Sequence, residues 1–125
     1  MITVLLDTNA LLLPHQHGVD VFSEIDRLIT ETHETITLST VAGELKALAD
    51  SASEDGVAAN VGLRLLEGKK VKMVPSSGPV DDAIVEYAAS KNAVVCTNDR
   101  DLKRRLKARG VRTIAMRGKT HLEMR

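Results

Sequence analysis

Residues 2–13 read ITVLLDTNALLL, a short run of apolar and β-branched residues that is ended by an aspartate. A run of this kind, apolar on both faces, is typical of a parallel strand covered by helices on both sides. Asp7 therefore stands where a turn or a helix cap begins, and aspartate is common at both. The same position is the carboxyl end of a strand, where α/β sheets bind ligands. Whether Asp7 is structural or functional depends on the residues at the ends of the other strands.

Four further segments have the same strand-like character and alternate with helical periodicity. This alternation predicts right-handed crossovers, a mainly parallel sheet of about five strands and helices on both of its faces. We expect a single α/β domain over residues 1–116 and a basic C-terminal tail over residues 117–125. The expected strands are 2–6, 35–39, 71–75, 93–97 and 111–116, and the helices cover 21–29, 41–48, 57–65, 84–88 and 102–106. His15 and His17 are expected in a surface loop bounded by Pro14 and Gly18.

The composition is that of an ordinary globular chain. It has 125 residues, of which 43% are hydrophobic and 27% are charged. No apolar run approaches the roughly 20 residues that a membrane span needs, and we see no signal peptide. The single cysteine, Cys96, has no internal disulfide partner and is expected to be a small buried apolar residue. These features predict a cytoplasmic protein that does not interact with membranes.

A formal net charge of zero hides a separation of charge along the chain. Residues 1–99 carry 15 acidic and 7 basic side chains, whereas residues 100–125 carry 10 basic and 2 acidic ones. A cationic C-terminal part next to an acidic remainder can attract a polyanion to a surface that also holds cation-binding groups.

Acidic residues follow several of the expected strands. Asp7 comes after the first strand and Asp99 after the fourth, so both lie at the same edge of the sheet. Glu44 is on the helix after the second strand, and Asp81 and Asp82 open the helix after the third. Singly, each fits a cap, a turn or a solvated position. Together they would repel one another unless a cation neutralised them, and a set of carboxylates without Cys or His suits Mg²⁺ or Mn²⁺.

These motifs, in this order, resemble those of the PIN-domain ribonucleases over almost the whole chain. The stretches that carry the resemblance are LLDTNALL (5–12), STVAGEL (39–45), DDAIVEYA (81–88) and VVCTNDRDLKRRLKARGVRTI (94–114). TNDRDLKRRL and the preceding Asp pair look most like the archaeal and eukaryotic PIN proteins related to ribosomal-RNA processing. The toxin branch of toxin–antitoxin pairs, the VapC type, more often has a TRN...DF pattern, which is not seen here.

The resemblance implies a three-layer α/β/α fold and a metal-dependent endonuclease that cleaves single-stranded or loop regions of RNA. Asp7, Glu44 and Asp99 match the family's acidic positions, and the third aspartate is Asp81 or Asp82, with Asp81 preferred. The aspartates would bind one or two Mg²⁺ or Mn²⁺ ions, and Glu44 would bind metal or position the attacking water. Residues expected to support this site by hydrogen bonds are Thr8, Asn9, Thr97, Asn98 and Asp101.

Basic side chains of the last helix and the C-terminal part are expected to guide the RNA backbone. They are Lys103, Arg104, Arg105, Lys107 and Arg109, joined by Arg112, Arg117, Lys119 and Arg125. With one Phe and one Tyr in the chain, base stacking on aromatic residues is not expected. Expected partners are RNA, a second copy in a homodimer, and a ribosome-assembly factor or an antitoxin.

Two other functions fit parts of the pattern. A non-catalytic RNA-binding or assembly module of the same fold would need the basic helix but not the acids. A phosphatase using Asp7 as nucleophile, of the haloacid-dehalogenase type, would have a second aspartate at position 9, where this chain has Asn9.

Overall fold

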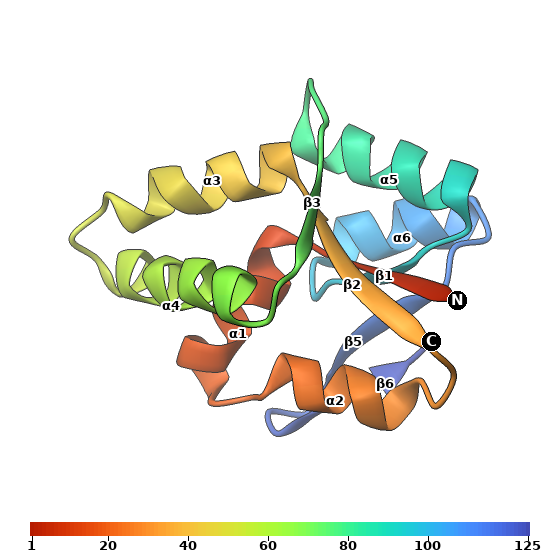
Figure 1. Ribbon diagram of the computed structural model, residues 1–125, viewed down its shortest axis with the longest axis horizontal. Coiled ribbons are helices and arrows are strands. Elements are labelled where there is room, and N and C mark those ends of the chain that lie inside the picture. Colours follow the sequence, from red (N-terminus) through yellow and green to blue (C-terminus); the bar gives the residue numbers. More distant parts are fainter.

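The computed structural model describes residues 1–125 in full (Figure 1). Six helices and six strands make up the chain. In chain order they are β1 (Ile2–Leu6), α1 (Thr8–His17), α2 (Val21–Leu28), β2 (His33–Leu38), α3 (Ser39–Ala49), α4 (Glu54–Gly68), β3 (Lys72–Val74), α5 (Val80–Lys91), β4 (Val94–Cys96), α6 (Arg100–Ala108), β5 (Thr113–Arg117) and β6 (His121–Met124).

The strands form one sheet in the order β3-β2-β1-β4-β5-β6, and all neighbouring pairs are parallel except β5 with β6. The chain moves outward from β1 to β2 and β3, and then crosses back to place β4 on the other side of β1. The order therefore reverses between β1 and β4. In an open parallel sheet the crevice for a ligand lies at such a reversal, outside the carboxyl ends of the two strands.

The helices form two groups, one on each side of the sheet, so the fold has three layers. α1 packs against α4, and α3 packs against α4, at the left in Figure 1, whereas α5 and α6 lie side by side at the upper right. Right-handed crossovers account for this division, because the chain crosses the sheet in opposite directions in its two halves. The expected α/β/α architecture is confirmed. A continuous apolar core of 31 buried residues joins the layers.

The C-terminal segment differs from the prediction of a basic tail. Residues 121–124 form β6, which pairs antiparallel with β5 after a turn at Gly118, so the sheet has six strands rather than about five. Leu122 is fully buried, and its backbone N–H and C=O groups bond to Glu24 and Arg27 of α2. These side chains satisfy the backbone groups of Leu122 at the outer edge of β6, which hinders pairing of that edge with another chain.

The prediction of a loop around His15 and His17 is wrong. α1 continues through Pro14 to His17 and ends at Gly18, which adopts a left-handed conformation with φ of 63°. Leu11, Leu12 and Leu13 are buried in the core immediately before the proline, and their packing holds the helix despite the N–H that Pro14 lacks. His15 lies 3.1 Å from Glu54 of α4.

None of the helices combines the length and the apolar character that crossing a membrane requires.

Close packing of α4 on α1 predicts opposite effects for two glycine substitutions. A Cβ atom at Gly62 would lie 2.6 Å from the backbone oxygen of Leu11, whereas one at Gly43 in α3 would meet nothing within 4 Å. Gly62→Ala should lower the free energy of unfolding by about 1–3 kcal/mol, because the helices must separate. Gly43→Ala should raise it by up to about 1 kcal/mol through helix propensity. Urea denaturation of both variants measures this, and equal effects would contradict the tight α1–α4 contact.

Candidate active site

The candidate site begins where β1 and β4 end side by side. Leu6, the last residue of β1, is paired with Cys96, the last residue of β4. The next residue, Asp7, continues the pairing, because its N–H donates to the Cys96 carbonyl oxygen at 3.2 Å. Thr97 continues from β4 in the same way toward β5, donating its N–H to Ile114. Asp7 and Thr97 are thus fixed by the sheet itself at the reversal of strand order.

Asp7 is a buried carboxyl group, with only 4% of its surface exposed. Its Oδ1 accepts the N–H of Ala10 at 2.8 Å and so caps α1, and its Oδ2 accepts the hydroxyl of Thr97. Burial raises the pKa of Asp7 to about 7, and the nearby carboxylates of Asp99 and Asp81 add to this effect. The hydrogen bonds from Thr97 and Ala10 lower the pKa but do not offset burial. The surroundings of Asp7 therefore disfavour its charged form.

Asp99 caps α6 in the same manner, since its Oδ1 accepts the N–H of Leu102 at 2.9 Å. Its own N–H donates to the Thr97 hydroxyl oxygen at 3.1 Å. That hydroxyl in turn donates to Asp7, so Thr97 connects the two aspartates. Capping and facing the site are compatible roles for these residues, because one carboxylate oxygen serves the helix and the group still lines the crevice.

The carboxylates come together around a small pocket of about 150 Å³. Each acid is brought there by a different βα unit: the loop after β1, α3 after β2, the first turn of α5 after β3, and the loop after β4. Glu44, on an exposed part of α3, accepts the hydroxyl of Thr8. The lining residues are Asp7, Thr8, Asn9, Glu44, Val80, Asp81, Ile84 and Asp99.

The structure separates Asp81 from Asp82. Asp81 lines the pocket, and its pKa is raised by desolvation and by the charges of Asp99, Glu44 and Asp82, against a lowering effect of Arg105. Asp82 is one residue further around α5, does not line the pocket, and forms an ion pair of 2.7 Å with Arg105 of α6. The two aspartates therefore face different surroundings.

Among the remaining predicted supporting residues, Asn9 and Asn98 connect the first turn of α1 to the loop after β4. The Asn9 side-chain oxygen accepts the N–H of Asn98 at 2.9 Å. Asp101 is placed elsewhere: it is exposed on α6, outside the pocket, with one oxygen 3.6 Å from Arg104.

The donor chemistry of the pocket fits a hard divalent cation. The titratable groups lining it are four carboxylates, and no thiol or imidazole is among them. Oxygen ligands of this kind suit Mg²⁺ or Mn²⁺ rather than zinc. No group of three or more Asp, Glu, His or Cys side chains is close enough together to hold a metal ion as the side chains stand. Besides burial, the charges of Asp99 and Asp81 raise the pKa of Asp7, and those of Asp99 and Glu44 raise the pKa of Asp81, as expected for acids that face one pocket.

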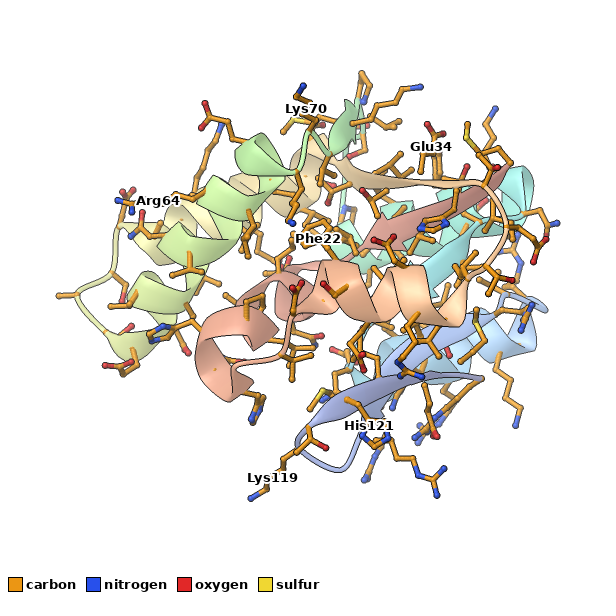
Figure 2. All side chains as sticks on the ribbon, turned by 60° about the horizontal axis from the view of Figure 1, so that its bottom comes forward. Phe22, Glu34, Arg64, Lys70, Lys119 and His121 are labelled. Carbon is orange, nitrogen blue, oxygen red and sulfur yellow. The ribbon has the colours of Figure 1, made fainter.

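The basic residues predicted to contact RNA fall into two groups. Arg105 and Arg109 are paired with Asp82 and Glu86 of α5, at 2.7 and 3.0 Å. Arg117 is 3.4 Å from Glu123, and Lys119 extends from the β5–β6 turn away from the rest of the molecule, as Figure 2 shows. Lys103, Arg104 and Lys107 instead line a cavity together with Arg100, which was not among the predicted residues. Arg100 precedes those three residues by three, four and seven positions, and this helical spacing could have identified it as part of the same basic face.

Comparison with known proteins identifies the family to which this chain is similar. The sequence model of the family described as "PIN like domain" matches residues 4–119. Ribonuclease VapC4 of Methanocaldococcus jannaschii is 31% identical over 127 residues, which cover 99% of this chain and 97% of that protein. Ribonuclease VapC9 of Archaeoglobus fulgidus is 35% identical over 107 residues, covering 85% of this chain and 76% of that protein.

Solved structures share the fold at lower sequence identity. A structure of the PIN domain endonuclease Utp24 has a TM-score of 0.79 at 20% identity and covers 98% of this chain and 90% of its own. The structure of VapBC-1 from nontypeable Haemophilus influenzae has a TM-score of 0.62 at 16% identity, with coverage of 86% and 94%. At these identities the likeness concerns the fold.

The raised pKa of Asp7 predicts that the acid destabilises the metal-free protein at neutral and alkaline pH. The folded-state pKa is about 7 against an ordinary value of 3.8. The stability that the protonated group contributes is therefore fully present below pH 3.8 and is lost as the pH rises toward 7. Asp7→Asn keeps a cap for α1 and removes this loss, so it should stabilise the protein by a few kcal/mol at about pH 8 but much less at about pH 4.

Urea denaturation in EDTA at the two pH values measures the difference. Asp101→Asn, an exposed aspartate outside the pocket, is the matched control and should show little change at either pH. If Asp7→Asn were destabilising at the higher pH, the buried carboxylate would be structural rather than strained.

Proposed function

Because this chain belongs to the PIN-like domain family, we propose that it is a metal-dependent endoribonuclease that cuts single-stranded or loop regions of RNA. The observation that carries the proposal is the convergence of Asp7, Glu44, Asp81 and Asp99 on one pocket. Four separate βα units supply these acids, and a merely structural role would not require them to face each other. The names of the two relatives, both ribonucleases, support the same reaction.

Asp7, Asp81 and Asp99 are the residues we propose to hold one or two Mg²⁺ or Mn²⁺ ions. Such ions, when bound, lower the pKa of water and stabilise the charge that develops on a phosphoryl group. Asp82 is left out of this set, because its carboxylate is paired with Arg105.

Glu44 is proposed to orient the attacking water and to accept its proton. Its Oε1 accepts the Thr8 hydroxyl, which fixes the carboxylate relative to α1 and leaves the second oxygen free. Thr97 is hydrogen-bonded to both Asp7 and Asp99, and the Asn9–Asn98 hydrogen bond joins the first turn of α1 to the loop after β4. These contacts restrain the acids at the rim of the pocket, so that only small side-chain movements would be needed to bind an ion, which lowers the cost of organising the reaction.

Two biological roles fit the same chemistry in the cytoplasm. One is ribosomal-RNA processing with an assembly factor, and the other is that of a toxin neutralised by an antitoxin. The names of the two sequence relatives favour the toxin role. Growth arrest when expression is induced, and no arrest for Asp7→Asn, would support a toxin. Unimpaired growth with altered ribosomal-RNA ends would support a role in processing.

We also propose that the protein forms a homodimer. Its molar mass in solution would test this.

The proposed reaction predicts RNA cleavage that requires a divalent metal. Purified protein should cut a labelled, partly structured RNA in Mn²⁺ or Mg²⁺ and not in EDTA. Asp7→Asn should lower the rate at least about a thousandfold, because the metal supplies several kcal/mol of transition-state stabilisation. Cleavage that persists in EDTA, or in the variant, would contradict the assignment. Absence of cleavage in all metals would leave a non-catalytic RNA-binding module.

The different surroundings of Asp81 and Asp82 predict that only one of them is essential. Asp81→Asn should lower the cleavage rate about a hundredfold or more, since it removes a charged ligand from the pocket. Asp82→Asn removes an exposed ion pair with Arg105 and should leave the rate within a few-fold of the wild type. Single-turnover rates of the two variants in Mn²⁺ measure the contrast. A larger loss in Asp82→Asn would contradict the assignment of Asp81 as the ligand.

A further inference from the structure

We propose that a second cavity, between α6 and the start of β5, binds the phosphate backbone of single-stranded RNA. This inference rests on the proposed function for the identity of the polyanion, but the cavity shares no lining residue with the carboxylate pocket. The cavity has a volume of about 580 Å³. Its lining consists of Arg100, Lys103, Arg104, Lys107, Val111, Thr113 and Arg125.

The lining carries an excess of positive charge, and no carboxylate is part of it. Five of the seven lining residues are Arg or Lys, and none is Asp or Glu. Arg100, Lys103 and Lys107 take part in none of the ion pairs of the chain. Arg104 is 3.6 Å from the exposed Asp101, and Arg125 is paired with Glu123. Like charges gathered around one hollow repel each other, and an anion bound there would relieve that repulsion.

The cations of α6 are sorted by helix face. Leu102 and Leu106 are buried toward the sheet, and Arg105 and Arg109 pair with carboxylates of α5. The remaining basic residues, at positions 100, 103, 104 and 107, have the i, i+3, i+4, i+7 spacing of a single stripe. One basic face of the helix therefore pairs with α5, while the other contains three basic residues, Arg100, Lys103 and Lys107, that have no carboxylate partner.

The cavity lies along α6, the helix that begins immediately after Asp99 of the carboxylate pocket. Arg100 directly follows Asp99, and α6 then runs back from the carboxyl edge of the sheet toward the start of β5. The stripe from Arg100 to Lys107 covers about 10 Å of helix at 1.5 Å per residue. Thr113, at the far end, is fixed by two backbone hydrogen bonds to Arg125. A strand with one phosphodiester at the acids can thus continue along this basic stripe.

The chemistry of the cavity selects a backbone rather than bases. No aromatic side chain is among its lining residues, so stacking of bases is absent, and its donors are the Lys and Arg groups that phosphates prefer. Binding of this kind does not depend on sequence and weakens as salt is raised. We therefore assign to the cavity the role of holding substrate beside the cleavage pocket.

The test is the affinity of the full-length protein for a short, unstructured, end-labelled oligouridylate, measured by fluorescence anisotropy in EDTA so that nothing is cleaved. Lys103→Gln with Lys107→Gln should weaken binding about tenfold at low salt and reduce the salt slope by about 1.4, since each lost contact on a single strand contributes about 0.7. Arg105→Gln with Arg109→Gln removes the same charge from the same helix and is the matched control. It should leave the salt slope unchanged.

The single variant Arg100→Gln tests a third basic residue of the cavity and should also weaken RNA binding. Thermal melting of each variant confirms that it is folded. Equal weakening in the two double variants, or none in Lys103→Gln with Lys107→Gln, would overturn the assignment. Wild-type cleavage in Mn²⁺ is measured separately. If Lys103→Gln with Lys107→Gln loses affinity and the wild type does not cut RNA, the RNA-binding cavity is supported and the nuclease function is contradicted. If the wild type cuts RNA and the same variant binds normally, the nuclease function is supported and the cavity assignment is contradicted.

Discussion

The rest of the site depends on a single buried carboxyl group. Asp7 sits where β1 ends beside β4, caps α1 with one oxygen and accepts the Thr97 hydroxyl with the other. Through Thr97 it is connected to Asp99, and through the start of α1, by way of Thr8, to Glu44. The reversal of strand order therefore does more than open a crevice. It brings together the N-termini of two helices, each capped by an aspartate that also faces the pocket.

This arrangement opposes stability in the absence of a ligand. Burial raises the pKa of Asp7, and the charges of neighbouring acids raise those of Asp7 and Asp81. The fold tolerates the conflict because the sheet, the caps and the close α1–α4 packing hold these residues independently of their charge. A bound divalent cation would neutralise the repelling carboxylates, and the proposed nuclease reaction uses the positive charge of that cation. The neighbouring cavity has the opposite electrostatic problem, because Arg100, Lys103 and Lys107 of α6 form no ion pair there.

Most of the sheet and of the carboxylate site could be predicted from the sequence, because apolar runs and turn residues indicate local structure. The five parallel strands and the acids after them are predicted to within a few residues. β6 was missed because its four residues are stabilised by α2, a contact between segments almost 100 residues apart. The loop at His15 was wrong because core packing, which periodicity does not report, outweighs Pro14. The choice between Asp81 and Asp82, and the sorting of the arginines, depended on how α5 and α6 face each other.

Whether these carboxylates form one cation site is tested most directly by a calorimetric titration of Mn²⁺ into the metal-free protein. Saturable binding is expected for the wild type and for Asp101→Asn, whose carboxylate lies outside the pocket, and loss of binding is expected for Asp99→Asn. Absence of binding to the wild type, or equal binding to Asp99→Asn, would contradict a shared cation site.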